Sequence, residues 1–432
     1  MDVVAGVPRP AGSWQVRAPL SKSEALRALT ILARTGGMLG HDGLLPDDVQ
    51  GFIHALRALG ATIGMADGTV FVHSPVDLLA TAPVTLHIPD GAAPARFLLA
   101  LAATLGRDVT VTGGPTLSKR ATYPLLATLG ALGARVSGGP GLPAVVGGPA
   151  VGGRCTDAGG SVSSQFLSAL LLVGAWFDRG IRVPASARGV SDGYVELTLA
   201  TLRHAGVDVR VEGRDIEVPP AAPSGPLMFH AGGDWSGAAP LLASAAFIDE
   251  PVTVAGLDPR SAQPDVAIVR HLRTLGMTVG MSDEGVTASG RVQRGGTFDV
   301  GNTPDLAPVL AALADVAPEP IRIENAPHLR HKESDRITDL AALLETAGLG
   351  VVAHHDGMVV QAPFKGDRDL RDGTGIVLDT RNDHRLAFAG ALLGLRRPGL
   401  VIAGAECVAK SFPSFFDTCP GTWSERPERS PR

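Results

Sequence analysis

The sequence predicts a mixed α/β protein with two similar domains, each built from three related units. Two repeating patterns lead to this prediction. A helix end, a glycine and a β-branched strand recur five times, and an almost wholly apolar helix recurs six times. A repeat of about 72 residues fits six times into the 432 residues of the chain.

The glycine of the first pattern stands between a helix and a strand, as in ALRALGATIG. Successive copies are 73, 73, 70 and 72 residues apart, and the sixth unit lacks this element. Glycine is favoured at the C-terminal cap because it adopts positive φ without strain. We therefore expect a helix to end, and a strand to follow, at Gly60, Gly133, Gly206, Gly276 and Gly348.

The second pattern predicts six buried helices, each with a polar or small residue at its start. At any single helix, this residue is explained as an ordinary N-cap. Six such starts in matching positions of the repeat indicate helix N-termini that can bind phosphate or carboxylate. The segments are SKSEALRALTILA, GAAPARFLLALAA, SSQFLSALLLVGA, DWSGAAPLLASAA, TPDLAPVLAALAD and NDHRLAFAGALLG.

Alternating side chains predict strands at residues 69–72 and 215–218. A segment rich in Pro, Gly and Ser at residues 219–229 predicts a domain boundary. The expected parts are a first domain at 17–225, a second domain at 1–16 plus 226–419, and a disordered tail at 420–432.

Composition argues against a general nucleic-acid binder, since the net charge is −5 and the pI is about 6.2. Three cysteines without metal-ligand spacing favour a reducing compartment. The N-terminus lacks the apolar core of a signal peptide, and the apolar run at 166–177 is too short to span a bilayer. We therefore expect a cytoplasmic protein that binds anions through a local cluster of cations.

Charged residues concentrate at residues 21–27, 329–337 and 381–385, with Lys119, Arg120 and Lys410 in addition. A charge run is usually a solvated surface, and each segment alone is explained in that way. However, Lys22, Asp305 and Arg385 stand at the starts of helices too apolar to lie on the surface. These segments are thus candidates for an anion-binding site.

The motifs SKSEALRAL, SSQFLSALLL, LRHKESDRI, NDHRLA and KSFPSFF occur in this order. The set resembles that of the 5-enolpyruvylshikimate-3-phosphate (EPSP) synthases, a family of enolpyruvyl transferases, over residues 18–417. The resemblance implies two domains of three βαβαββ units. It also implies transfer of the enolpyruvyl group of phosphoenolpyruvate to the 5-hydroxyl of shikimate 3-phosphate, with release of phosphate. It implies no cofactor, metal, nucleic acid or membrane partner, and a monomer is expected.

The resemblance also implies residue roles. For shikimate 3-phosphate it implies Lys22, Ser23, Arg27, Ser163, Ser164, Gln165, Ser191, Tyr194, Asp305 and Lys332. For phosphoenolpyruvate it implies Lys22, Arg120, Gln165, Arg336, Arg385 and Lys410. Asp305 is the candidate that takes the hydroxyl proton, and Glu333 and Lys22 are both candidates to protonate the methylene carbon. His384 is retained as a neighbour of the catalytic residues.

One segment departs from the family pattern. Residues 90–93 read Asp-Gly-Ala-Ala where the family has an Asn-Ala-Gly-Thr type of motif. The amide and hydroxyl expected to support Lys22 and phosphoenolpyruvate are missing, and Asp90 adds negative charge. Leu20, Ala121 and His328 are further departures. This pattern leaves open a divergent paralogue that acts on a related shikimate or cyclitol derivative.

Two other hypotheses remain. UDP-N-acetylglucosamine enolpyruvyl transferases share the repeat, but they carry a reactive cysteine in the loop that corresponds to residues 114–122, where this chain has none. A non-catalytic protein that binds shikimate phosphate is the other. Retention of Lys22, Asp305, Glu333 and Lys410 argues against it, because a binder needs no groups for proton transfer.

Overall fold

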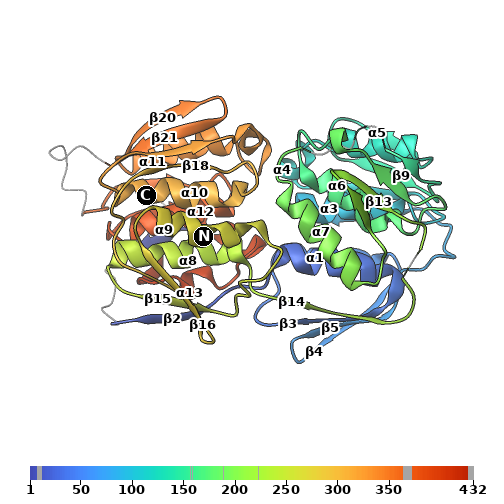
Figure 1. The fold of residues 1–432 in the computed structure, drawn as a ribbon, viewed down its shortest axis with the longest axis horizontal. Coiled ribbons are helices and arrows are strands. Elements are labelled where there is room, and N and C mark those ends of the chain that lie inside the picture. The colour runs from blue at the N-terminus through green and yellow to red at the C-terminus, as the bar shows by residue number, and fades with distance from the viewer. Residues whose placement is uncertain are drawn as a thin grey trace, which may run out of the picture. The chain divides into compact units, whose positions relative to one another are not determined.

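The computed structural model describes residues 1–426 apart from 7–11, 156, 158, 188, 222 and 363–371. The chain divides into two compact units (Figure 1). The continuous unit is Leu20–Gly232, and the discontinuous unit combines Met1–Pro19 with Gly233–Arg432. The described residues form six four-stranded sheets, three in each unit. The predicted mixed α/β class and sixfold repeat are confirmed.

The continuous unit contains seven α-helices among its described residues. They are α1 (Lys22–Thr35), α2 (Asp47–Ala58), α3 (Ala92–Ala102), α4 (Pro115–Ser118), α5 (Tyr123–Ala131), α6 (Ser164–Gly174) and α7 (Gly193–His204). Its sheets have the strand orders β14 (Leu227–Ala231), β3 (Gly37–His41), β5 (Thr69–Ser74), β4 (Thr62–Ala66); β6 (Val84–Ile88), β7 (Val109–Gly113), β9 (Ala144–Gly147), β8 (Arg135–Gly138); and β10 (Gly153–Arg154), β11 (Ile181–Val183), β13 (Asp215–Val218), β12 (Arg210–Glu212).

The discontinuous unit contains six α-helices among its described residues. They are α8 (Trp235–Ile248), α9 (Ile268–Thr274), α10 (Ala307–Ala312), α11 (Arg336–Thr346), α12 (His384–Gly394) and α13 (Phe415–Thr418). Its sheets have the strand orders β16 (Thr278–Ser282), β17 (Gly285–Ser289), β15 (Val252–Ala255), β2 (Trp14–Arg17); β18 (Gly296–Asp299), β19 (Ile321–Glu324), β21 (Gly357–Gln361), β20 (Gly350–His354); and β22 (Val377–Asp379), β23 (Val401–Ala403), β1 (Val3–Ala5), β24 (Trp423–Glu425).

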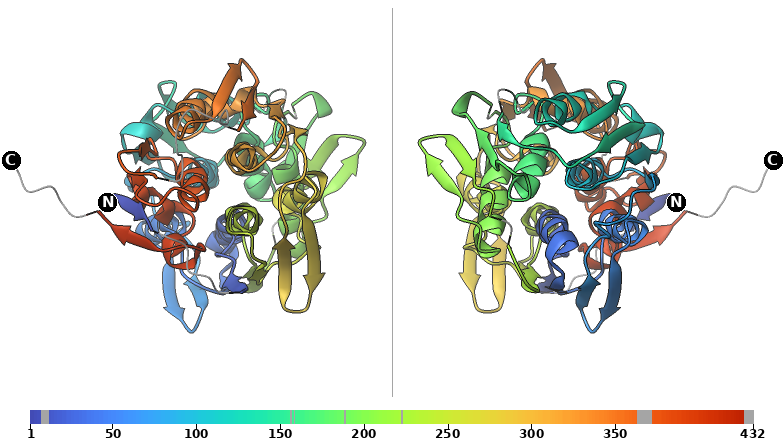
Figure 2. Two further views of the ribbon diagram at one scale, coloured as in Figure 1. Left: turned by 90° about the vertical axis from the view of Figure 1, so that its left-hand side faces the viewer. Right: turned by 90° about the vertical axis from the view of Figure 1, so that its right-hand side faces the viewer.

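In four of the six copies the buried helix connects two parallel strands of one sheet, as α3, α6, α10 and α12 do. In five copies a second helix leads into an antiparallel hairpin. In one copy, α10 connects the parallel strands β18 and β19, and α11 leads into the hairpin of β20 and β21. The helices α1, α3 and α6 contact one another in the continuous unit, as α8, α10 and α12 do in the other unit. Hairpins such as β16–β17 and β20–β21 lie at the outer edge (Figure 2). The polar helix starts are therefore carried by the central helices of each unit.

The recurring glycines end five helices as predicted. Their φ angles lie between 81° and 100°. At the first, Gly60 N donates to Arg57 O and Ala61 N donates to Leu56 O, which are the two bonds of a Schellman motif. The same pair of bonds recurs at the other four glycines, and a strand begins within four residues of each. Glycine is needed there because positive φ strains any residue with a Cβ atom.

Two strands differ from the expected domain boundaries. β14 belongs to the continuous unit because it pairs in parallel with β3, and β2 belongs to the discontinuous unit because it pairs in parallel with β15. The boundaries therefore lie at 19/20 and 232/233 rather than at 16/17 and 225/226. β2 directly precedes α1 of the continuous unit, and β14 directly precedes α8 of the discontinuous unit. Each strand thus joins the sheet of the unit to which its following helix does not belong, and local sequence does not reveal this exchange.

The predicted disordered tail was wrong in part. Trp423–Glu425 form β24, which pairs with β1 beside β23 and takes the place that a hairpin strand has in the other sheets. Residues 427–432 of the predicted tail lie outside the described residues. No helix in the described part of the chain is long and apolar enough to cross a membrane.

Two glycine substitutions separate backbone strain from steric overlap. Gly206→Ala adds a methyl group to open space, whereas in Gly276→Ala the new Cβ atom lies 2.7 Å from Gln293 Cβ. Both positions have positive φ, so we expect Gly206→Ala to lower stability by about 1–2 kcal/mol. Gly276→Ala should lower it further. Urea unfolding followed by circular dichroism measures both; equal losses would contradict the steric part of this prediction.

Candidate active site

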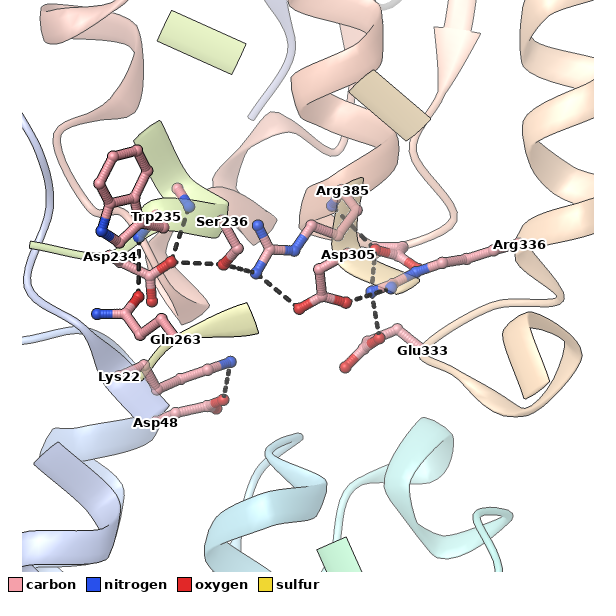
Figure 3. A network of polar contacts seen from close by, with 12 residues as sticks. Lys22, Asp48, Asp234, Trp235, Ser236, Gln263, Asp305, Glu333, Arg336 and Arg385 are labelled. Atoms are coloured by element: carbon pink, nitrogen blue, oxygen red, sulfur yellow. Dashed lines mark hydrogen bonds and ion pairs between the residues drawn. The ribbon is translucent and has the colours of Figure 1, made fainter. Parts of the chain in front are cut away.

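The discontinuous unit contains a buried ion-pair network centred on Asp305 (Figure 3). Asp305 lies in the short helical turn Pro304–Leu306 before α10, Arg336 begins α11, and Arg385 lies in the first turn of α12. Asp305 Oδ1 accepts from Arg336 Nη1 at 2.8 Å, and Oδ2 accepts from Arg385 Nη2 at 2.9 Å. The side chains of Arg336 and Arg385 are 1% and 3% exposed, whereas that of Asp305 is 24% exposed. Two buried guanidinium groups thus share one partly exposed carboxylate.

Arg336 is held by two further carboxylates. Its Nε donates to Asp383 Oδ2 at 2.8 Å, and its Nη2 donates to Asp383 Oδ1 at 3.2 Å and to Glu333 Oε2 at 2.7 Å. Asp383 is fully buried and also caps α12 by accepting from the backbone N–H of Arg385 at 2.9 Å. The Asp383 carboxylate therefore positions both arginines. It accepts from the guanidinium group of Arg336 and from the backbone N–H of Arg385.

Arg385 is linked to the start of α8. Its Nη2 donates to Ser236 Oγ at 2.7 Å, and Ser236 Oγ donates to Asp234 Oδ1 at 2.5 Å. Asp234 is the N-cap of α8 and accepts from Gly237 N. The guanidinium group also lies over the Phe388 ring at 5.5 Å. Three central helices, α8, α10 and α12, therefore contribute to the surroundings of Arg385.

Charge in this network changes the pKa of its members. Burial raises the pKa of Asp305, but the two guanidinium groups and the Lys332 ammonium outweigh burial and hold the pKa well below its usual range. Burial lowers the pKa of Arg336, but its three carboxylate partners outweigh burial and raise the pKa well above its ordinary value. At neutral pH Asp305 is a carboxylate and Arg336 is a cation.

His328 is buried beside these groups, in the turn Pro327–His331. Within the described residues, neither of its ring nitrogens has a hydrogen-bond partner. Burial, aided by Lys332, lowers the pKa of His328 to about 3. The imidazole is therefore neutral at pH 7. A buried polar group without a protein partner is uncommon in native proteins.

The continuous unit holds a second charged group, at the start of α1. Lys22 Nζ lies 2.9 Å from Asp48 Oδ2, and the two side chains are 17% and 11% exposed. A Cβ atom at Gly91 would lie 2.6 Å from Asp48 Oδ1. Asp48 therefore occupies the space beside residues 90–93, where the family pattern is altered. Its carboxylate is the ion-pair partner of Lys22.

Two buried arginines of the continuous unit, Arg27 and Arg96, form hydrogen bonds that link separate segments of this unit. Arg27 donates to Thr198 Oγ1 at 2.9 Å, to Tyr194 O at 3.0 Å and to Ser23 O at 2.8 Å, which ties α1 to α7. Burial lowers the pKa of Arg27 to about 10, so it stays charged at pH 7. The second arginine is Arg96 of α3.

Arg96 is buried and contacts two segments that carry predicted ligand residues. Its Nη1 donates to Gln165 Oε1 at 2.6 Å and to Ser163 Oγ at 3.3 Å, and its Nη2 donates to Ala121 O at 3.0 Å. The guanidinium group lies 4.3 Å from the centre of the Phe166 ring. Arg96 thus fixes the side chains at the start of α6 and the backbone beside Arg120.

Ser191 has φ +57° and is buried, and its Oγ has no hydrogen-bond partner among the described residues. A non-glycine residue in this conformation is strained by about 1–3 kcal/mol, and such strain is concentrated at functional sites. Ser164 is buried at the start of α6. The ligand contacts of Ser191 and Ser164 stay predictions.

A family model described as EPSP synthase (3-phosphoshikimate 1-carboxyvinyltransferase) matches residues 12–419. The chain belongs to the EPSP synthase family. A 3-phosphoshikimate 1-carboxyvinyltransferase of Halobacterium salinarum is 35% identical over 424 residues, which are 94% of this chain and 96% of the relative. One from Methanocella arvoryzae is 33% identical over 414 residues, which are 93% and 94% of the two chains.

Solved structures show the same fold. EPSP synthase from Acinetobacter baumannii is similar with a TM-score of 0.75 at 24% identity, and the match covers 98% of this chain and 99% of that one. The enolpyruvyl transferase NikO from Streptomyces tendae gives a TM-score of 0.74 at 18% identity, with 98% of each chain covered. At these identities the likeness concerns the fold.

The residues predicted from EPSP synthase motifs are divided between the two units. The continuous unit holds Lys22, Ser23, Arg27, Arg120, Ser163, Ser164, Gln165, Ser191 and Tyr194. The discontinuous unit holds Asp305, Lys332, Glu333, Arg336, His384, Arg385 and Lys410. Lys410 Nζ donates to Asn382 O at 2.6 Å, and His384 packs edge-on against Phe388 at 5.8 Å. The ligand contacts of all these residues stay predictions.

The motif comparison missed Asp48, Arg96, Ser236 and Asp383. Arg96 had a signal in the sequence, since it is a charged residue in an otherwise apolar helix. Asp383 lies inside the NDHR motif, but its bonds to Arg336 span 47 residues of sequence. Lys22 and Asp48 are 26 residues apart. Only the tertiary structure shows these pairings.

We expect Asp383→Asn to destabilise the protein by about 3–5 kcal/mol, because it leaves the buried Arg336 with less negative charge. The matched control is Asp379→Asn, which removes an exposed partner of Arg381 and should change stability by less than about 1 kcal/mol. Urea unfolding at pH 7 compares the two variants. Similar effects would show that the Asp383 carboxylate does not stabilise the network.

A second prediction concerns pH. His328 binds a proton in the unfolded chain below about pH 6.5, but in the folded protein only near pH 3. Its contribution to stability is therefore complete above pH 6.5 and is lost as the pH falls toward 3, by about 1.4 kcal/mol per pH unit. His328→Asn should lessen the pH dependence of urea unfolding between pH 6 and 4, whereas the exposed His355→Asn should leave it unchanged. Equal slopes in all three proteins would refute this account.

Proposed function

We propose that this chain transfers the enolpyruvyl group of phosphoenolpyruvate to the 5-hydroxyl of shikimate 3-phosphate, and that inorganic phosphate is released. Family membership supports this reaction. The structural observation that carries it is the pair of buried guanidinium groups, Arg336 and Arg385, directed at one carboxylate. Guanidinium groups match the geometry of carboxylate and phosphate, and phosphoenolpyruvate carries both anions.

The reaction is an addition followed by an elimination. In the addition, the methylene carbon takes a proton while the hydroxyl oxygen bonds to C2 and gives up its own proton. In the elimination, the new methyl group loses a proton as the bond from C2 to the phosphate oxygen breaks. Each step needs a group that accepts a proton and a group that donates one, as well as cations that stabilise the leaving phosphate.

The residues of each unit suit separate parts of this chemistry. Asp305 is proposed to accept the hydroxyl proton, and Glu333 and Lys22 are both candidates to protonate the methylene carbon. Arg120, Arg336, Arg385 and Lys410 are proposed to bind phosphoenolpyruvate. The proposed contacts of shikimate 3-phosphate are Ser23, Arg27, Ser163, Ser164, Gln165, Ser191, Tyr194 and Lys332. A cytoplasmic location and a monomeric state stay predictions.

A second candidate is transfer to a related shikimate or cyclitol derivative. It is favoured by the altered residues 90–93 and by His328, whose ring nitrogens lack protein partners within the described residues. A neutral imidazole can donate one hydrogen bond and accept another, so it suits a hydroxyl-bearing acceptor. An assay with a panel of shikimate and cyclitol phosphates, each with phosphoenolpyruvate, decides between the two acceptor classes.

The purified protein should release phosphate only when both shikimate 3-phosphate and phosphoenolpyruvate are present. Asp305→Asn should lower kcat by a factor of about 10²–10⁴ with a smaller change in KM, because it removes a proton acceptor. Asp283→Asn, at an exposed position of the same unit, is the control and should be fully active. Binding of shikimate 3-phosphate without phosphate release at any phosphoenolpyruvate concentration would instead identify a non-catalytic binder.

A further inference from the structure

Both carboxylate oxygens of Asp305, the proposed proton acceptor, are hydrogen-bonded to cations. Both oxygens of Asp305 accept a charged N–H group, Oδ1 from Arg336 and Oδ2 from Arg385 (Figure 3). A nearby opposite charge stabilises the ionised form of a carboxylate and so weakens it as a base. In this arrangement Asp305 is an ion-pair partner and a poor proton acceptor. A working base therefore requires a change in the surroundings of Asp305.

The charged groups around Asp305 come from several elements. α11 contributes Arg336 and α12 contributes Arg385, while the segment between Pro327–His331 and α11 contributes Lys332 and Glu333. His328, on the same turn, is neutral because burial lowers its pKa to about 3. Three cations therefore dominate the environment of Asp305, and they outweigh the opposing effect of the Glu333 carboxylate. A ligand that offsets this excess of positive charge around Asp305 must itself be an anion.

The two arginines are anchored independently of Asp305. Arg336 is held by Asp383 through two bonds and by Glu333 through one, and Arg385 donates to Ser236. Both guanidinium groups would therefore keep their positions if Asp305 were replaced as an acceptor. Asp305 is also the most exposed of the three side chains, so an anion can approach beside it.

We propose that Arg336 and Arg385 hold Asp305 as an ion-pair partner until an anionic substrate accepts their N–H groups, so that substrate binding itself converts Asp305 into a proton acceptor. This inference rests on the function proposed above. The anion takes over hydrogen bonds from the guanidinium groups and adds negative charge near Asp305, and both effects strengthen the base. The proton then moves from the hydroxyl of the acceptor to a carboxylate oxygen of Asp305, and the hydroxyl oxygen bonds to C2 of the bound phosphoenolpyruvate. The π bond between C2 and the methylene carbon breaks in this step, and the methylene carbon takes a proton from Glu333 or Lys22.

The test is a titration of Asp305 in the full-length protein with 13C-labelled Asp side-chain carboxyl groups. Asp305→Asn identifies the resonance by its disappearance. Without a ligand, we expect no titration of Asp305 at any pH above about 3 at which the protein stays folded. With saturating phosphoenolpyruvate, we expect Asp305 to titrate at a pH above about 3, within the range in which the protein stays folded, because the influence of the two arginines is partly neutralised. Inorganic phosphate should give a smaller rise in the pKa of Asp305.

Asp379 is the internal control, because it is paired with Arg381 but lies on the surface. Its titration should not respond to either ligand. The variant Arg385→Gln provides a second test, since it removes one of the two cations and should raise the pKa of Asp305 without any ligand. An unchanged pKa of Asp305 with saturating phosphoenolpyruvate, or in Arg385→Gln, would overturn the proposal.

The phosphate-release assay separates this inference from the proposed function. If the protein releases phosphate but phosphoenolpyruvate does not change the titration of Asp305, the proposed conversion of Asp305 into a proton acceptor is refuted. The transferase function then still stands. If phosphoenolpyruvate raises the pKa of Asp305 but no phosphate is released, the proposed conversion of Asp305 is supported and the transferase function is refuted. The two measurements use the same protein, so a folding defect cannot be mistaken for either outcome.

Discussion

The discontinuous unit depends on compensation of a buried positive charge, the guanidinium group of Arg336. A cation removed from water must be paired and hydrogen-bonded, because its desolvation costs several kcal/mol. Arg336 meets this requirement with Asp305, Glu333 and Asp383. These partners come from the segment before α10, from the residues before α11 and from the cap of α12. One charge thus brings the starts of three helices together.

The repeat explains why charged residues can occupy the interior at these positions. In α6, α8 and α12, no charged side chain lies beyond the first turn. Several polar residues at helix starts act first as caps, since Ser21, Ser163, Asp234 and Asp383 all accept from backbone N–H groups. These four polar side chains are therefore ordinary N-caps. Asp234 and Asp383 also support arginines, so capping and site formation use the same carboxylates.

The continuous unit meets the same requirement with different residues. Lys22 pairs with Asp48, and Gly91 leaves the space that Asp48 occupies. A carboxylate beside residues 90–93 is thus the direct partner of the lysine. The three cysteines are buried, and burial raises the pKa of Cys155 to about 11 and of Cys407 to about 12. These two thiols are poor nucleophiles at neutral pH, in agreement with chemistry based on carboxylates and cations.

The sequence by itself determined the features that depend on neighbours along the chain. The helix-ending glycines, the six apolar helices and the strands after each glycine follow from backbone conformation and from periodicity, and they were predicted. The tertiary structure alone decided the exchange of β2 and β14, the pairing of β24 with β1, and the partners of Lys22 and Arg336. These contacts join residues far apart in sequence, where several strands and carboxylates are chemically equivalent candidates. Only their positions in the folded chain select one of them.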